Sequence, residues 1–433
     1  MIESAPHPRS LVSSLLWFAL GSIFILLVSF LTVKSPFVGF AVAYVVCFLA
    51  LAWQMPIVAL TLIFILAPFQ SDVGGGGFAR MGISEVNLAL TAFVFLFQNM
   101  VRKRPLLMGP LTYPILIYLF ISVVVSIPNW RGEVSMLSSL QMVLYFVIAV
   151  AVFASFPPRL ESLPKILYAS VFVGIIIAIA GAATNYSFMG MNKNGLGASL
   201  SVITVICFEL WLAARTKRSK TFLAVALAIM SASLLFSLSR GAWLGALVGI
   251  MVILGLRRQF RVLIKASLIL VPVIAVCWSL LPQESREYAT GFEKDRWNIR
   301  LRYESIDFAK EQWHSSPIYG VGVGLRKQYD ATNVALLTLA ETGVLGLATF
   351  AWIHVAIFFW VWRFQKSLPR GTPLYSLLAL AAALVANKLA HGMVDHYWSR
   401  GSIMMAWATV GMAMGLYYHY SNQRLQAKER ENG

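Results

Sequence analysis

The sequence contains few charged residues and almost no cysteine. Of its 433 residues, only 12 % are Asp, Glu, Lys or Arg, whereas a soluble globular domain carries roughly 25 %. The three cysteines, Cys47, Cys207 and Cys277, all lie in apolar runs, which argues against a disulfide framework and against a thiolate metal site. The chain is instead 59 % hydrophobic, with a mean hydropathy of +0.74. This composition is typical of a polytopic membrane protein.

Long apolar runs account for most of the chain. A helix needs roughly 20 apolar residues to cross a bilayer, so the sequence predicts an all-α membrane protein with about 12–14 transmembrane helices. The spans are predicted near 11–33, 37–53, 55–69, 83–101, 110–128, 137–156, 164–183, 195–214, 221–239, 241–256, 262–281, 333–362, 374–390 and 401–420. The first run is too long for the core of a signal peptide, so we expect it to be an anchor. We expect one integral membrane domain, residues 1–433, with a large loop at 282–332.

The basic residues predict how the chain crosses the membrane. There are 35 Lys and Arg against 18 Asp and Glu, a formal net charge of +17. In a soluble protein this excess would suggest nucleic acid, but here basic clusters follow alternate spans, as at 102–104, 215–220 and 257–265. Cytoplasmic loops carry such clusters, so we expect both termini in the cytoplasm and no nucleic acid partner. The outer face then receives the polar segments at 192–195, 239–241, 282–332 and 391–400.

Arg240 lies between two apolar stretches, in Ser239-Arg240-Gly241. An arginine at the end of a span costs free energy unless it is paired or reaches the interface, and such residues are functional candidates. The alternative is an interfacial anchor beside Trp243. The small residues that follow, Gly241 and Gly245, permit close approach of another helix or of a ligand.

Three arginines stand close together in the long loop, Arg296, Arg300 and Arg302. On a helix the first two share a face and the third points elsewhere. One guanidinium group can bind two phosphate oxygens at once and remains charged at physiological pH, so these residues are candidate anion ligands. The loop also holds eight acidic residues against eight basic ones. Ordinary solvated ion pairs are therefore the alternative.

A glycine run, Gly320-Val-Gly-Val-Gly324, follows these arginines. It lacks the Lys-Ser/Thr of a P-loop and differs from the dinucleotide fingerprint, so nucleotide binding is not expected. The glycines instead predict a tight backbone path or a nest of backbone amides for an anion.

The turn at 391–400 combines two imidazoles with a carboxylate, His391, Asp395 and His396. His391 and Asp395 are four residues apart, so on a helix the aspartate could orient the histidine as a general base. Two histidines and an aspartate could also bind a metal, although no separate ligand cluster supports one. A polar belt at the membrane interface, with Tyr397 and Trp398, is the third interpretation.

Taken together, these segments resemble the family of O-antigen ligases and Wzy polymerases, bacterial membrane glycosyltransferases. The resemblance covers roughly the second half of the chain and depends on the order and spacing of its motifs. These are Asn192-Lys193-Asn194-Gly195, Ser239-Arg240-Gly241, Arg302 ahead of Pro317-Ile-Tyr-Gly320-Val-Gly322, and Asn333 followed by Gly343-Val-Leu-Gly346.

The resemblance implies an all-helical, GT-C-like fold in the bacterial inner membrane, with an active site on the periplasmic side. It implies a glycan donor carried on undecaprenyl pyrophosphate and transfer, without metal or other cofactor, to an acceptor hydroxyl. As an O-antigen ligase in lipopolysaccharide biosynthesis, the protein would use lipid A–core as acceptor. The chain departs from the family at Thr332, because the family pattern places a histidine directly before the asparagine that is Asn333 here.

Displacement of a lipid pyrophosphate needs cations for the leaving group and a base for the attacking hydroxyl. The predicted pyrophosphate ligands are Arg240, Arg302, Arg300, Arg296, Lys193 and Asn194. The predicted catalytic group is His391 or His396, with Asp395 and, as a weaker candidate base, His314. Direct attack would invert the anomeric centre.

Two other functions remain open from the sequence. A Wzy-type polymerase would use the same donor, with another lipid-linked repeat as acceptor. A flippase or transporter of lipid-linked oligosaccharide would also be polytopic and basic, but it should carry charge deep in its spans. The predicted spans hold little charge, with Lys388 near an outer end and Glu209 near an inner end, which argues against an ion-coupled carrier.

Overall fold

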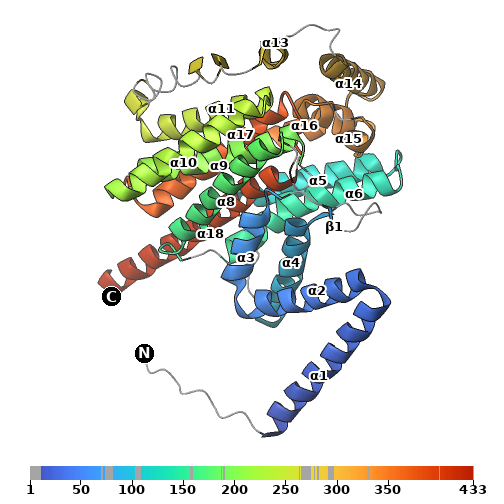
Figure 1. Cartoon of the computed structure of the whole chain (residues 1–433), viewed down its shortest axis with the longest axis vertical. Helices are drawn as coiled ribbons and strands as arrows, with labels where there is room; N and C mark the ends of the chain where they lie inside the picture. Colours follow the sequence, from blue (N-terminus) through green and yellow to red (C-terminus); the bar gives the residue numbers. More distant parts are fainter. Residues whose placement is uncertain are drawn as a thin grey trace.

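The protein is a bundle of long helices with a layer of shorter polar helices across one end (Figure 1). The computed structural model describes residues 11–69, 72–73, 81–102, 109–156, 159–186, 188, 191–262, 264, 275–276, 278–279, 282–290, 297–329, 331–398 and 400–432. Within these residues, ten helices are long and apolar enough to cross a membrane, and two shorter apolar helices accompany them. The predicted all-helical polytopic membrane fold is confirmed.

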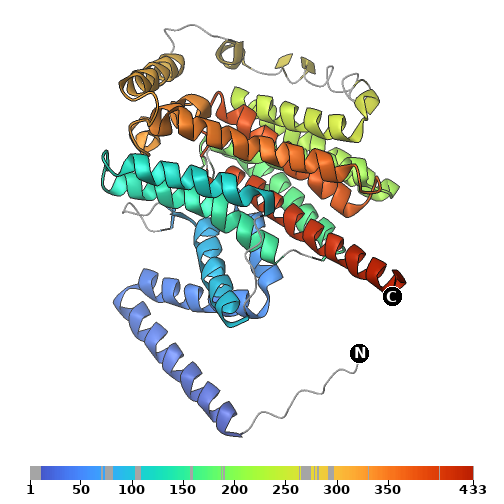
Figure 2. The same ribbon diagram turned by 180° about the vertical axis from the view of Figure 1, so that it is seen from behind.

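The first three N-terminal helices are separated by prolines, and a short strand pair precedes the fourth. They are α1 (Leu11–Lys34), α2 (Pro36–Gln54), α3 (Pro56–Leu66) and α4 (Ile83–Arg102), with a two-residue antiparallel pair, β1 (Asp72–Val73) and β2 (Met81–Gly82), before α4. Pro36 and Pro56 occupy the first turns of α2 and α3, where a missing N–H costs nothing. The apolar stretch 37–69 therefore forms two helices. Figures 1 and 2 show α1 and α2 extending away from the main bundle.

The main bundle follows in chain order. Its elements are η1 (Gly109–Leu111), α5 (Thr112–Ser126), α6 (Glu133–Met142), η2 (Val143–Ala149), α7 (Val150–Ser155), α8 (Leu163–Ala183), α9 (Lys193–Ala213), α10 (Lys217–Phe236), α11 (Arg240–Arg257), α16 (Val334–Gln365), α17 (Pro373–Gly392) and α18 (Arg400–Asn432). The π-helix η2 joins α6 and α7 into one span over Glu133–Ser155. The span predicted near 262–281 lies largely outside the described residues.

Close packing of α9, α11 and α17 forms the centre of the bundle. Gly241, Gly245 and Gly249 recur every four residues along α11, and an added Cβ at Gly245 would lie 2.9 Å from the backbone oxygen of Asn387 on α17. Small residues at this spacing let two helices approach closely. The amide of Asn387 also donates to Ser201 Oγ of α9 at 2.7 Å. The glycines of α11 thus accommodate another helix.

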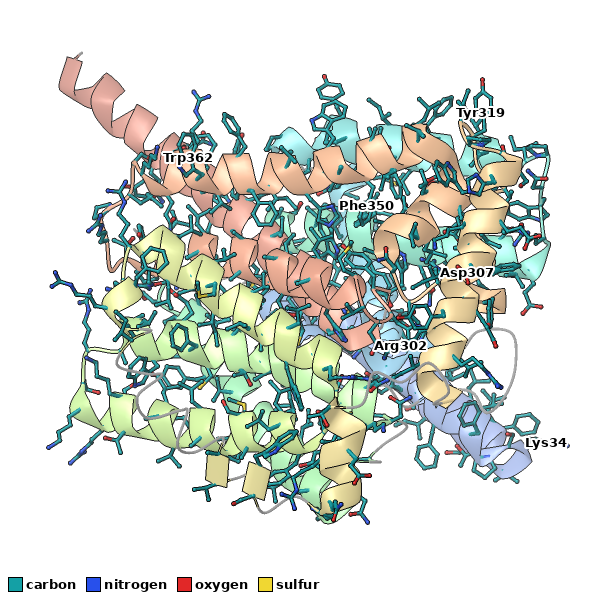
Figure 3. All side chains as sticks on the ribbon, turned by 90° about the horizontal axis from the view of Figure 1, so that it is seen from above. Lys34, Arg302, Asp307, Tyr319, Phe350 and Trp362 are labelled. Carbon is teal, nitrogen blue, oxygen red and sulfur yellow. The ribbon has the colours of Figure 1, made fainter. Side chains whose placement is uncertain are left out.

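The predicted loop is itself largely helical. It contains α13 (Gln283–Thr290), α14 (Trp297–Ser315) and α15 (Leu325–Gln328). Seen from above, α14 crosses one end of the bundle, with Arg302 at that end and Trp362 of α16 at the other (Figure 3). We call this the site end, because α9 and α11 begin there and α17 ends there.

Candidate functional site

Arg302 reaches from α14 to the turn between α17 and α18. Its Nη1 donates to the backbone oxygen of Val394 at 2.9 Å, and its Nη2 lies 3.4 Å from Asp395 Oδ2. The Asp395 side chain is only 4 % exposed, whereas that of Arg302 keeps 35 %. A guanidinium carries five N–H donors, so the contacts to the turn leave further donors for a ligand. Arg302 is therefore both fixed and accessible.

Asp395 lies between the two histidines of the turn. His391 Nε2 is 3.9 Å from Oδ2, and His396 Nε2 is 3.9 Å from Oδ1, which also accepts the His396 backbone N–H at 2.8 Å. Burial alone raises the pKa of the Asp395 carboxyl, but interaction with His391 and the charges of His396 and Arg302 outweigh it. They hold that pKa well below its usual range, so the carboxylate stays ionised at neutral pH.

The two histidines differ in exposure. The His391 side chain is 3 % exposed and neither of its ring nitrogens has a hydrogen-bond partner among the residues that the structure describes, whereas the His396 side chain is 52 % exposed. An added Cβ at Gly241 would lie 2.7 Å from His391 Cδ2, so the ring packs against the first turn of α11. His391 thus joins the Asp395 turn to the Arg240 segment, and His396 faces outward.

Asn333, the capping residue before α16, connects this helix to the same turn. Its Oδ1 caps the helix by accepting from Leu336 N at 3.0 Å, while its Nδ2 donates to the backbone oxygen of Met393 at 3.0 Å. The preceding residue, Thr332, adopts φ = 48°. A β-branched residue rarely adopts this left-handed conformation, so this position is strained. The sequence motif that contains Asn333 gave no sign of its contact with Met393.

Arg240, Lys193 and Asn194 stand at the site end. Arg240 is the first residue of α11, and Lys193 and Asn194 open α9 behind the cap Asn192, whose Oδ1 accepts from Gly195 N at 2.9 Å. The two helix starts touch, because an added Cβ at Gly197 would lie 2.8 Å from Ser239 Cβ. The predicted convergence of these residues with the 391–400 turn is therefore present in the fold.

Two other predicted site residues, Arg300 and His314, are not part of this arrangement. Arg300 points away from the bundle, with its side chain 56 % exposed and paired with Glu304 at 3.4 Å. His314 is exposed and twelve residues beyond Arg302 on α14, which separates their backbones by about 18 Å along a helix. Arg296 lies outside the described residues. Helical periodicity predicted that Arg302 and Arg300 lie on different faces of a helix, and their different partners on α14 confirm this.

The glycine run is a tight backbone path, but it does not form an amide nest open to an anion. The N–H groups of Val321 and Gly322 donate to backbone oxygens of α16, and that of Gly324 donates to the Glu341 carboxylate at 2.8 Å. The amide of Gly324 thus binds a carboxylate of the protein itself rather than an external anion. Gly320 and Gly343 have φ of +73° and +65°, and Gly343 marks a kink within α16 that packs against Ile318.

Two buried basic residues near the turn were not predicted as site residues. Lys388, one turn before His391, is 1 % exposed, donates from Nζ to Ser402 Oγ at 3.1 Å, and interacts electrostatically with Asp395. The Arg326 guanidinium stacks 4.6 Å from the centre of the Trp398 ring. A charged residue inside an apolar span is the signal that marks Lys388 in the sequence.

The fold and the charged turn at its end define a polytopic membrane protein with a candidate anion site at one end of its spans. Residues 223–351 match the family model Wzy_C, described as O-antigen ligase. The match supports the O-antigen ligase and Wzy family and confirms the resemblance seen in the sequence. It includes Arg240, Arg302 and Asn333, while Asp395 lies beyond it. A search of curated proteins gives no match.

Proposed function

We propose that this protein is a membrane glycosyltransferase that moves a glycan from undecaprenyl pyrophosphate to an acceptor hydroxyl, as an O-antigen ligase of the bacterial inner membrane. The family match supports a ligase-type or polymerase-type function. The observation that carries the site is the contact of Arg302 with Asp395 beside the first turn of α11. In this proposal the site end faces the periplasm, as the basic clusters predict.

The proposed pyrophosphate site is formed by Arg302, Arg240 and the start of α9. As the bond between the anomeric carbon and the pyrophosphate oxygen breaks, the bonding electrons remain on that oxygen. Fixed guanidinium groups stabilise this charge best when they are positioned beforehand. Arg302 meets that condition, because Val394 and Asp395 hold it in place. Lys193 and Asn194 are proposed to add contacts from the N-terminus of α9, where the helix dipole favours an anion.

We assign the general base to His396. Its ring is exposed, so an acceptor hydroxyl can approach it, and Asp395 lies beside its Nε2. The hydroxyl oxygen attacks the anomeric carbon from the face opposite the leaving pyrophosphate, and its proton passes to the imidazole. The carboxylate of Asp395 stabilises the imidazolium that forms. His391 is proposed to hold Asp395 from the buried side.

The test of this function uses a deletion strain and the purified protein. If the protein is a ligase, lipid A–core from the deletion strain should carry no long polysaccharide chains on a gel of surface polysaccharide. A single repeat retained on the core would identify a polymerase instead. Transfer from purified lipid-linked glycan should continue in EDTA, because the proposed charges come from arginines. A requirement for an added divalent cation would contradict that part of the proposal.

A further inference from the structure

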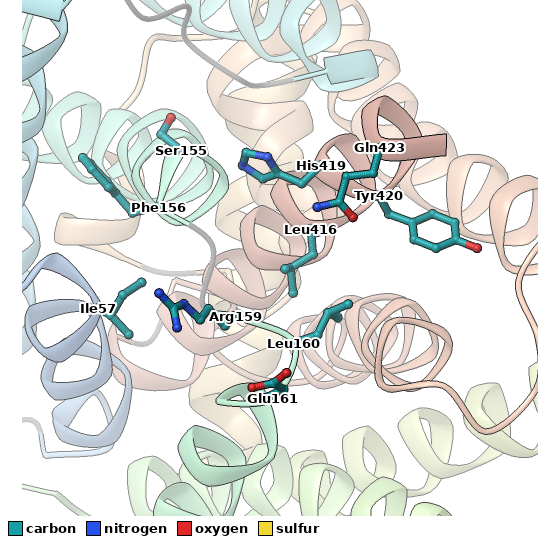
Figure 4. A pocket seen from close by; sticks show the side chains of 10 residues that line it. All are labelled: Ile57, Ser155, Phe156, Arg159, Leu160, Glu161, Leu416, His419, Tyr420 and Gln423. Carbon is teal, nitrogen blue, oxygen red and sulfur yellow. The ribbon is translucent and has the colours of Figure 1, made fainter. Parts of the chain in front are cut away.

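A hollow of about 560 Å³ opens at the end of the bundle opposite the candidate site. Its lining residues are Ile57, Ser155, Phe156, Arg159, Leu160, Glu161, Leu416, His419, Tyr420 and Gln423 (Figure 4). Leu416 and Gln423 follow Arg400 by 16 and 23 residues along α18, which is about 24–35 Å of helix. The hydrocarbon core of a bilayer is about 30 Å thick. The hollow therefore lies at the level of the other membrane surface.

The hollow has a polar mouth and an apolar floor. Ile57 and Phe156 also line a narrow cleft between α3, α7, α8 and α18. The remaining residues of that cleft are Leu60, Thr61, Phe153, Ile166 and Met412, all apolar except one. The hollow itself is lined by Ile57, Phe156 and Leu416 as well as by charged residues, so a ligand that fills it would match the lining with a charged or polar head and a hydrocarbon part.

The mouth presents charges of both signs. Arg159 and Glu161 are two residues apart in the turn before α8, both are exposed, and neither forms an ion pair with another residue that the structure describes. Arg159 extends toward Ile57, with His419 and Gln423 above it in the view of Figure 4. A simple anion at Arg159 would meet the repulsion of Glu161, whereas a zwitterion would satisfy both residues.

We propose that this hollow binds a glycerophospholipid whose headgroup carries both a phosphate and a primary ammonium. The phosphate accepts from the Arg159 guanidinium and the His419 ring, and the ammonium donates to the Glu161 carboxylate. One acyl chain lies in the hollow itself, against its apolar lining residues Ile57, Phe156 and Leu416. The site would fix the orientation of α18 relative to α3 and α7, independently of the glycan-transfer site at the other end.

Native mass spectrometry of the full-length protein in detergent tests this proposal. The probes are phosphatidylethanolamine, phosphatidylglycerol and inorganic phosphate, and the variants are Arg159→Ala and Glu161→Gln. Lys165→Ala is the matched control, because Lys165 is exposed at the same end but does not line the hollow. Monodisperse elution in size-exclusion chromatography checks that each variant is folded.

The wild-type protein should retain phosphatidylethanolamine in preference to phosphatidylglycerol. Arg159→Ala should reduce retention of both lipids about tenfold, the scale of a lost hydrogen bond to a charged group. Glu161→Gln should remove the preference for phosphatidylethanolamine, and Lys165→Ala should behave as wild type. Equal retention by all variants, a preference for phosphatidylglycerol, or displacement of the lipid by inorganic phosphate would overturn the proposal.

Discussion

The guanidinium of Arg302 on α14 lies 3.4 Å from the carboxylate of Asp395, in the turn after α17. The two residues are 93 positions apart, so the contact joins the large polar segment to the end of the bundle. It also places a cation next to a carboxylate that already faces His391 and His396. The proposed reaction needs this juxtaposition of an anion-binding group and a base.

Replacement of Arg302 should abolish transfer while replacement of Arg300 should not. Loss of one positioned charge donor typically lowers a rate about 100- to 1,000-fold. Arg300→Ala is the matched control, since Arg300 is two residues away on α14 but exposed and paired with Glu304. The measurement is transfer of glycan from lipid-linked donor in proteoliposomes. Equal activity of the two variants would remove Arg302 from the site.

Substitution of the three candidate bases, His396, His391 and His314, should affect the transfer rate to different extents. His396→Ala should lower the transfer rate about 100- to 10,000-fold, the range of general base catalysis. His391→Ala should lower it less and should also lower thermal stability, because the buried ring packs against Gly241. His314→Ala should have no effect. If His391→Phe, which keeps the packing, loses all activity while His396→Ala does not, the base is His391.

Asp395→Asn should weaken the fold in a pH-dependent way. The folded-state pKa of Asp395 lies below its usual value, which is about 3.9 in an unfolded chain. The stability that Asp395 contributes is therefore fully present above about pH 4 and is lost as the pH falls toward the folded-state value. The wild type should unfold at a higher temperature than Asp395→Asn at pH 7, and the difference should shrink below pH 4. A constant difference would show that the charge is not responsible.

Glu209 and Arg257 form a buried ion pair near the C-terminal ends of α9 and α11, away from the candidate site. Arg257 Nε donates to Glu209 Oε2 at 3.0 Å, and Nη2 donates to Ser376 Oγ of α17 at 2.7 Å. Arg257→Ala should destabilise the protein by about 3–5 kcal/mol, because it leaves a buried carboxylate unpaired. The exposed Arg261 provides the control variant Arg261→Ala.

Thermal unfolding in detergent measures this effect, and glycan transfer at low temperature should be retained. The double variant Glu209→Gln/Arg257→Met should recover much of the lost stability, since it removes both buried charges. If Arg257→Ala and Arg261→Ala unfold at the same temperature, the pair contributes nothing to the fold.

Hydropathy and helical periodicity predicted much of this structure, but not its contacts. Apolar runs located the ten described helices that are long and apolar enough to cross a membrane, and the spacing of Arg300 and Arg302 placed them on different faces of a helix, as observed. Spacing could not tell that Arg302 meets Asp395, because that contact depends on how α14 and α17 lie at the end of the bundle. Nor could it show that the glycine run binds Glu341, a residue of the protein itself, because that contact depends on the kink at Gly343.

The most direct measurement of the central claim is glycan transfer by the purified protein in proteoliposomes. The assay supplies a lipid-pyrophosphate-linked glycan together with lipid A–core and compares wild type with Arg240→Ala and Arg302→Ala. We predict that the wild type forms a glycan–core product, and that both variants elute as folded protein but form almost none. Absence of product with the wild type, or wild-type rates in both variants, would contradict the account.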